Sequence, residues 1–367
     1  MNFLITAAGL GSRFLKSGIK PPKPLILVKG LELLLWSLSS FSFYNNDNLY
    51  IVSLKQDNVK SRLENKIKLI YPNINVYWYE LPSHHKGQLL TALKAIEYFS
   101  IEGPITIHNC DTSYSTTNIS SYRNPGEEYF GAIPYFNAKG DHWSFLKINS
   151  EKSLVMQVTE KIRISEHCSV GTYIFRDARE MFTMAQKYID SLSIQFKNSN
   201  ELYIAPLYQY ALVNKEKILP LFIEGVKVFG TCEELLQAFG ISYFDLLSEN
   251  AWSAHQRKTI VVDIDGTICS PPENNDYSKC TPLNDLCLKL IEEDAKGTYI
   301  ILCTARNLRQ FKGNLGFINK YTAPTLQEWL KLYQIPYDEI YYAKQWGQGG
   351  VTYIDDKNML IKDFINA

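Results

Sequence analysis

The sequence lacks an excess of charge of either sign, and this absence excludes two classes of partner. Its 367 residues include 38 Lys and Arg against 38 Asp and Glu, so the formal net charge at pH 7 is zero. Nucleic-acid binders and proteins held on anionic lipid usually carry a basic surface. We therefore expect no nucleic acid and no membrane as a partner, and any anionic ligand must be bound by a local group of cations.

Long apolar runs and paired cysteine motifs are also missing. The most apolar stretch, residues 33–36 followed by serine-rich sequence, is too short and too polar to span a bilayer. The N-terminus lacks the charged-then-apolar pattern of a signal peptide. The seven cysteines contain no CxxC pair and form an odd set, which argues against a zinc site and a disulfide framework. We expect reduced, mostly buried thiols in a cytoplasmic protein.

The length predicts two or three domains, each large enough to bury a core. Residues 247–257 are polar and show no strand pattern, so we interpret them as a linker. Residues 258–262, KTIVV, then supply the β-branched run of a buried central parallel strand. We expect two α/β domains, over residues 1–248 and 257–367.

A glycine-rich turn follows the first predicted strand, residues 3–6, in the run AAGLGSRF. Such a turn before a helix exposes backbone N–H groups that can bind phosphate oxygens. Arg13 lies just behind the glycines, and Lys23 follows in the run PPKPL. The turn lacks the GKS or GKT ending of a P-loop and the third glycine of a dinucleotide fingerprint. These residues indicate a nucleotide site of another kind.

The whole pattern, LITAAGLGSRF followed by PPKPLILVKG, resembles the signature of the sugar-phosphate nucleotidylyltransferases. The resemblance implies Mg²⁺-dependent transfer of a nucleoside monophosphate from an NTP to a sugar or polyol phosphate, with release of pyrophosphate. It also implies that the strand ending at Asp111 supplies a metal ligand. Arg13 and Lys23 would take part in catalysis by neutralising the triphosphate. The implied nucleotide-binding residues are Ala8, Gly9, Gly11, Ser12, Arg13, Lys23, Gly87 and Gln88.

The base and the acceptor stay open, because CTP, UTP and GTP all fit a Gly87-Gln88 pair facing the base. The adjacent His84 and His85 are expected at the surface. Glu160 and Lys161 resemble the family's acceptor-binding pair, and Gly171 resembles the glycine against which the sugar packs. Several relatives carry a second metal-binding Asp where this chain has Val226-Lys-Val. A fully protein-ligated two-metal site is therefore not expected.

The main alternative prediction for this domain is a glycosyltransferase of similar fold. Such enzymes usually have two spaced acidic residues at the end of a strand, whereas this chain has one, Asp111. The chain also carries the glycine-rich nucleotide loop followed by PKPL. The sequence therefore favours the nucleotidylyltransferase.

The second domain begins with the run Asp263-Ile-Asp265-Gly-Thr at a strand end, where α/β sheets bind ligands. This run resembles motif one of the haloacid dehalogenase (HAD) superfamily. The resemblance implies that Asp263 is the phosphoryl-accepting nucleophile and Asp265 the general acid and base. Thr304 and Lys344 resemble motifs two and three. The implied Mg²⁺ ligands are Asp263, Asp265, Asp355 and Asp356.

The TAR, WLKLYQIPYDEI and IDD runs further resemble the capsule-biosynthesis phosphatase branch. Insertions are short, which predicts a capless domain whose intermediate is shielded by the first domain or by a partner subunit, so a homo-oligomer is one expected assembly. We thus expect two Rossmann-like domains, an N-terminal mixed sheet and a C-terminal parallel sheet, in a bifunctional enzyme of activated-sugar supply for capsule or another surface glycan. The alternatives are a non-catalytic regulatory HAD-like module and a metabolite-binding protein without turnover.

Overall fold

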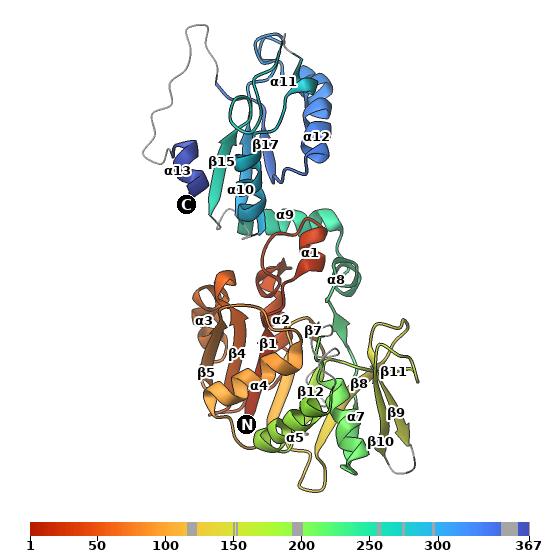
Figure 1. Cartoon of the computed structure of the whole chain (residues 1–367). Helices are drawn as coiled ribbons and strands as arrows, with labels where there is room; N and C mark the ends of the chain where they lie inside the picture. Colours follow the sequence, from red (N-terminus) through yellow and green to blue (C-terminus); the bar gives the residue numbers. More distant parts are fainter. Residues whose placement is uncertain are drawn as a thin grey trace. The chain divides into compact units, whose positions relative to one another are not determined.

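The computed structural model describes residues 1–115, 123–149, 151, 153–192, 201–254, 258–273, 276–295, 298–345 and 359–366. The chain forms two compact units, Met1–Asn250 and Ala251–Ala367 (Figure 1). The helix α9 (Tyr243–Ala254) contains the boundary between them. Each unit is described by itself.

The first unit is built on a ten-stranded mixed sheet. Its parallel part consists of β1 (Asn2–Ala7), β4 (Asn48–Leu54), β5 (Asn75–Leu81) and β6 (Ile105–Asn109), with β1 between β4 and β6. Five of the six residues of β1 are buried, as expected for a parallel strand that is covered on both faces. The mixed α/β fold predicted for the N-terminal part is confirmed.

The rest of this sheet pairs largely antiparallel and begins where β12 runs against β6. The strand order is β10-β9-β11-β8-β12-β6-β1-β4-β5, and β13 pairs with β8. The additional strands are β8 (Gly131–Asn137), β9 (Ser144–Asn149), β10 (Leu154–Glu160), β11 (His167–Ser169), β12 (Thr172–Phe175) and β13 (Ile218–Phe222).

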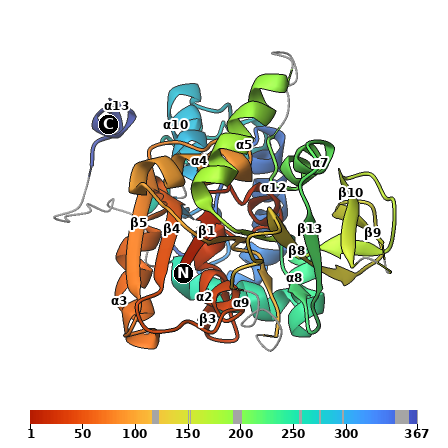
Figure 2. The ribbon, with the colours of Figure 1, turned by 90° about the horizontal axis from the view of Figure 1, so that it is seen from below.

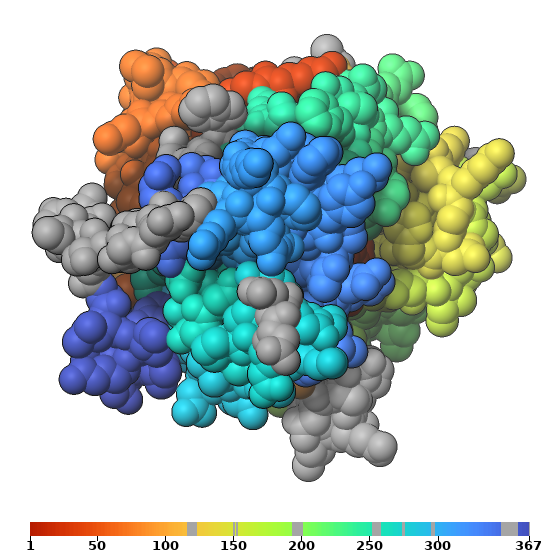
Figure 3. Space-filling model, turned by 90° about the horizontal axis from the view of Figure 1, so that it is seen from above, coloured from red at the N-terminus to blue at the C-terminus, as the bar shows by residue number. Residues whose placement is uncertain are grey.

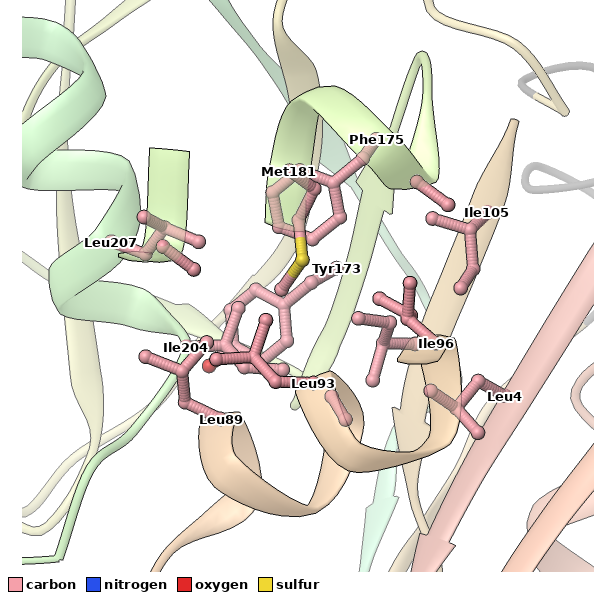
Figure 4. Close-up of a cluster of buried hydrophobic side chains, with 14 of the residues drawn as sticks. Leu4, Leu89, Leu93, Ile96, Ile105, Tyr173, Phe175, Met181, Ile204 and Leu207 are labelled. Carbon is pink, nitrogen blue, oxygen red and sulfur yellow. The ribbon is translucent and has the colours of Figure 1, made fainter. Parts of the chain in front are cut away.

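Helices cover both faces of the parallel strands (Figure 2). Along β1, Leu4 points into a core with α4 (Gln88–Phe99), α5 (Ala178–Ser191) and α7 (Ala205–Val213), part of which is drawn in Figure 4. Its neighbours Phe3 and Ile5 point into the opposite core, with α2 (Leu33–Leu38) and α3 (Val59–Ile70). This alternation follows from the two-residue period of a strand.

Short elements complete the first unit. They are α1 (Ser12–Lys16), η1 (Lys23–Leu25), β2 (Leu27–Val28), β3 (Leu31–Glu32), η2 (Lys55–Asp57), β7 (Thr112–Ser113), β14 (Lys227–Val228) and α8 (Cys232–Phe239).

The predicted linker over residues 247–257 contains the boundary between the two units, and its first part is helical, because α9 extends to Ala254. The polar residues that suggested a linker bind the backbone of the β2-β3 turn instead. Asn250 donates to the carbonyl of Leu27 and accepts from its N–H, both at 2.9 Å. Glu249 accepts from the N–H groups of Lys29 and Gly30. The partners in these contacts are more than 200 residues apart in the sequence, so no local sequence pattern predicts them.

The second unit contains a parallel sheet with the order β15-β16-β17, from β15 (Thr259–Asp263), β16 (Tyr299–Cys303) and β17 (Glu339–Tyr341). The expected buried central strand is only partly buried among the described residues, since β15 pairs with β16 alone and Val261 is 63% exposed. The run VTYI at residues 351–354, which the sequence predicts to be the last strand of this domain, lies outside the described residues. The other elements are η3 (Tyr277–Lys279), α10 (Asn284–Ala295), α11 (Leu315–Phe317), η4 (Ile318–Thr322), α12 (Ala323–Leu332) and α13 (Ile361–Asn366).

A separate core holds the second unit together. Ile264, Leu302 and Leu326 are fully buried in it, and the indole N–H of Trp329 donates to the carbonyl of Cys280 at 2.8 Å. In Figure 3 the residues of this unit, coloured from cyan to blue, present a closely packed face. Six of the chain's seven cysteines are buried, as predicted. Within the described parts of the chain, every helix is too short or too polar to cross a membrane.

Candidate functional site

A cavity of about 410 Å³ opens in the first unit where β1 and β6 end. Its wall contains every residue predicted for the site of the first domain, from segments far apart in the sequence. These residues are Ala8, Gly9, Gly11, Ser12, Arg13, Lys23, Gly87, Gln88, Asp111, Glu160, Lys161 and Gly171. The fold thus brings the predicted nucleotide, metal and acceptor residues around one space.

At two positions in the cavity wall, the neighbouring atoms leave no room for any residue other than glycine. Gly87 has φ 106°, and a Cβ atom there would lie 2.3 Å from the carbonyl oxygen of Leu202. Gly171 has φ 77°, and its Cβ would lie 2.1 Å from Nδ2 of Asn109. Any side chain at either position would displace a neighbour and adopt an unfavourable left-handed conformation. These glycines let the backbone itself form the cavity wall.

Lys23 and Asp111 form an ion pair inside the cavity. Burial lowers the pKa of Lys23, but the charge and hydrogen bond of Asp111 outweigh this effect, so its pKa is raised overall. Burial raises the pKa of Asp111, and the charge of Lys23 reverses this, leaving its pKa lowered. Both groups are therefore charged over the physiological pH range, as electrostatic binding of phosphate and metal requires.

A second carboxylate, that of Glu234, lies close to Gly230, as Asp111 does. A Cβ atom on Gly230 would lie 3.3 Å from Oδ2 of Asp111 and 3.2 Å from Oε2 of Glu234. Both carboxylates therefore lie close to Gly230, and carboxylate oxygens are donors that Mg²⁺ prefers. Sequence reasoning missed Glu234, although the spacing of Thr231 and Glu234 predicts the helix cap that holds it: the N–H of Thr231 donates to Oε2 at 2.9 Å.

The part of the cavity around Glu160 and Lys161 combines charge with aromatic rings. Burial raises the pKa of Glu160, which accepts a hydrogen bond from the hydroxyl of Ser144. Lys161 donates to the hydroxyl of Tyr203 at 2.9 Å and lies 4.5 Å from the centre of its ring. Trp143 lines the same space. Such a surface can pair with hydroxyl groups and with a phosphate.

His84 and His85 are half-exposed, in agreement with the surface position predicted for them. Both residues line the cavity, and Nδ1 of His84 lies 3.0 Å from the carbonyl oxygen of Ala8 in the glycine-rich loop. The pair sits in a polar segment, which made a solvent position the simpler expectation. His84 and Ala8 are 76 residues apart in the sequence, so the sequence around His84 does not predict their contact.

In the second unit, the predicted catalytic residues converge at the ends of β15 and β16. Lys344 forms an ion pair with Oδ1 of Asp263 at 2.5 Å, and the hydroxyl of Thr267 donates to Oδ2 at 3.1 Å. The hydroxyl of Thr304 lies 3.4 Å from Oδ2 of Asp265. The Asp263 carboxylate is an oxygen donor that fits Mg²⁺. Asp355 and Asp356 lie outside the described residues.

Arg306 completes this cluster, and sequence reasoning gave it no role although it belongs to the TAR run. It is 1% exposed, and its Nε and Nη2 lie 2.9 and 2.8 Å from Oδ1 of Asp265. Nη2 also lies 3.3 Å from the sulfur of Cys269. Ligand atoms of Asp265, Cys269 and Cys280 lie within 4.8 Å of one another, but the guanidinium beside them opposes a cation there.

No protein-family model and no curated protein matches the chain. Its N-terminal part matches the structure of a nucleoside-diphosphate-sugar pyrophosphorylase from Vibrio cholerae RC9, with 26% identity and a TM-score of 0.57 over 68% of this chain and 100% of that one. The first unit is similar to the sugar-phosphate nucleotidylyltransferases. The resemblance predicted for the N-terminal domain is confirmed.

Two further matches are weaker. An inositol-1-phosphate CTP transferase from T. maritima matches with 10% identity and a TM-score of 0.50, over 68% of this chain and 95% of that one, and shares the fold alone. The C-terminal part matches a structural-genomics target from Vibrio cholerae with 40% identity over 30% of this chain and 89% of that one. The TM-score is 0.28 and no activity is attached to that protein, so this match carries no argument about chemistry.

Proposed function

We propose that the first unit transfers a nucleoside monophosphate from an NTP to a sugar or polyol phosphate and releases pyrophosphate. One observation carries the proposal: the loop, cationic, acidic and acceptor residues of this reaction line a single cavity. The similarity to a nucleoside-diphosphate-sugar pyrophosphorylase supports the same reaction class. Pyrophosphate release from CTP, UTP and GTP with a panel of phosphorylated sugars and polyols identifies the base and the acceptor.

The chemistry follows from the charges around the cavity. The acceptor phosphate attacks the α-phosphorus while pyrophosphate leaves, so the site must neutralise negative charge and hold attacker and leaving group in line. Arg13 and Lys23 supply positive charge at the glycine-rich loop, and Lys161 supplies it at the acceptor end. Mg²⁺ held by Asp111, with Glu234 nearby, would neutralise the phosphates further. A phosphate that displaces Asp111 from Lys23 leaves this carboxylate available as a metal ligand.

We propose that the second unit is a capless HAD-type phosphatase with Asp263 as its nucleophile. Asp263 would attack the phosphorus, Asp265 would protonate the leaving alcohol and then activate water, and Thr304 and Lys344 would bind the phosphoryl group. Mg²⁺ held by Asp263, with Asp355 and Asp356, would offset the charge of the phosphate, whereas Oδ1 of Asp265 pairs with Arg306. The convergence of Asp263, Asp265, Thr304 and Lys344 supports this role over a non-catalytic regulatory module.

Reciprocal variants of the full chain test both proposals. We expect Lys23→Ala and Asp111→Asn to lower pyrophosphate release by about a hundredfold or more, because each removes a preorganised electrostatic partner. Neither should change Mg²⁺-dependent phosphate release from an aryl phosphate. Lys16→Ala, an exposed lysine on α1, is the matched control and should keep the wild-type rate. A wild-type rate in Lys23→Ala or Asp111→Asn would remove the role assigned to that residue.

The converse variant is Asp263→Asn, which should abolish phosphate release, because an amide is a poor nucleophile, and leave pyrophosphate release intact. Asp285→Asn, at an exposed acid on α10, is its control. If the wild-type chain releases no phosphate from any aryl or sugar phosphate with Mg²⁺ present, the second unit is the regulatory module instead.

A further inference from the structure

We infer that Arg306 is a positioning residue of the second unit, which fixes the Asp265 carboxyl group so that Oδ2, and not Oδ1, carries the proton given to the leaving alcohol. The inference rests on the proposed phosphatase reaction and adds a residue to its predicted machinery. Arg306 is 1% exposed, so it acts through Asp265 and does not touch the substrate.

The guanidinium of Arg306 directs two N–H groups at one oxygen of Asp265. Nε and Nη2 lie 2.9 and 2.8 Å from Oδ1. An oxygen that accepts two charge-assisted hydrogen bonds is a poor position for a proton. The other oxygen, Oδ2, lies 3.4 Å from the hydroxyl of Thr304, the residue proposed to bind the phosphoryl group. The oxygen left to carry the proton is therefore the one beside the proposed phosphoryl site.

Arg306 is itself held on several sides. The centre of the Tyr277 ring lies 4.7 Å from the guanidinium carbon, and the sulfur of Cys269 lies 3.3 Å from Nη2. The backbone N–H of Arg306 donates to the hydroxyl oxygen of Thr304 at 3.0 Å, which leaves the hydrogen of that hydroxyl for another acceptor. A side chain supported in this way can hold its partner in one orientation.

Stability alone does not explain an arginine at this position. A buried ion pair stabilises a fold little more than apolar residues of the same size do. The remaining nitrogen, Nη1, is buried and has no hydrogen-bond partner within the described part of the chain, which lowers stability further. Orientation of Asp265 is a role that an apolar residue could not take over.

The two steps of the proposed reaction use Oδ2 in opposite directions. First, an oxygen of Asp263 forms a bond to phosphorus, the bond from phosphorus to the leaving oxygen breaks, and the proton on Oδ2 of Asp265 moves to that oxygen. Then Oδ2 takes a proton from the water that attacks phosphorus, which releases phosphate and restores the Asp263 carboxylate. Between the steps, the positive charge of Arg306 stabilises the Asp265 carboxylate.

The need for this proton depends on the leaving group, which provides a specific readout. The p-nitrophenolate ion leaves readily without a proton, whereas phenolate is a poorer leaving group and gains more from protonation. The two phosphate esters have nearly the same shape, so differences in binding are small. Their kcat/KM values report the reaction only up to the departure of the phenol, so the later attack of water does not enter the comparison.

The experiment measures kcat/KM of the full chain, with Mg²⁺ present, for p-nitrophenyl phosphate and for phenyl phosphate. Arg306→Lys keeps the charge but loses the planar fork. The ratio of the p-nitrophenyl to the phenyl value should rise by about tenfold or more, because a general acid contributes about 10²–10⁴-fold only when it is correctly placed. Arg309→Lys, at an exposed arginine of the same segment, should keep the wild-type ratio. In an Asp265→Asn background, Arg306→Lys should leave the ratio unchanged.

Tyr277→Leu is a second variant, which removes the ring beside the guanidinium at a half-exposed position and leaves Arg306 in place. It should raise the same ratio, and it carries the test if Arg306→Lys does not fold. An equal loss with both esters would mean that Arg306 only supports the fold, and this result overturns the inference, as does an unchanged ratio. A wild type that releases no phosphate from either ester overturns the proposed phosphatase together with the inference, whereas an active wild type with an unchanged ratio in the variants overturns the inference alone.

Discussion

His108, at the end of β6, shows how hydrogen bonds fix the state of a single buried residue. Its Nε2 lies 3.1 Å from the carbonyl oxygen of Thr112 and therefore donates, and its Nδ1 lies 2.8 Å from the hydroxyl of Thr172. Burial lowers the pKa of His108 to about 4. The hydrogen bond from the neutral ring to Thr112 therefore helps to hold the turn that contains Asp111.

The lowered pKa of His108 predicts a defined acid sensitivity. The unfolded chain takes up a proton near pH 6.5 and the folded chain only near pH 4, so stability is complete above pH 6.5 and is lost as the pH falls between these values. The loss from this residue should be about 3 kcal/mol. Chemical denaturation at pH 7 and pH 4 should show it in the wild type and a correspondingly smaller loss in His108→Gln. His142→Gln, at a largely exposed histidine, should behave as the wild type does.

At the scale of elements, the segment between β11 and β12 is formed around Gly171. Gly171→Ala introduces both left-handed strain and a clash with Asn109, whereas Gly103→Ala has a similar φ, 74°, and free space for its Cβ. Each variant should lose about 1–2 kcal/mol through strain. Gly171→Ala should lose about 1–3 kcal/mol more through overpacking and raise KM for the acceptor, since Asn109 lines the cavity. If Gly171→Ala and Gly103→Ala lose the same free energy of unfolding, Asn109 moves away from the new methyl group without an energetic cost.

The elements also show what the sequence could and could not predict. The strand before Asp111 and the glycine-rich turn after β1 were predictable, because apolar runs and glycines are local signals. Functional residues at strand ends followed from the same reasoning. Their convergence on one cavity agrees with the general placement of ligands at the carboxyl ends of parallel strands.

The failures concern residues whose partners are distant in the sequence. Asn250 forms hydrogen bonds with the backbone of Leu27, and Glu234 lies close to Gly230, as Asp111 does; each pair, Asn250 with Leu27 and Glu234 with Asp111, is more than 100 residues apart. Arg306 is buried against Asp265 although an isolated arginine is usually exposed. Tertiary contacts determine where these side chains lie, so hydrophobic periodicity and composition cannot predict their positions.

On the scale of the whole molecule, two phosphate chemistries on one chain must not undo each other. The proposed transferase needs the phosphate of its acceptor as the attacking group, and the proposed phosphatase removes phosphates of the same general kind. If both used the same molecule, the phosphatase would destroy the substrate of the transferase. We therefore expect the two activities to act on different phosphates of one reaction sequence.

The comparison that checks this uses kcat/KM for phosphate release by the full chain, with two substrates. One is the acceptor that gives the fastest pyrophosphate release, and the other is the same compound with a second phosphate. We expect the bisphosphate to be preferred by about tenfold or more, a ratio that needs only 1.4 kcal/mol of differential transition-state binding. Asp263→Asn should remove both phosphate-releasing reactions and leave nucleotidyl transfer to the monophosphate unchanged, which shows that one site is responsible. Preference for the monophosphate would mean that the phosphatase opposes the transferase, and a regulatory or salvage role would then replace the sequential one.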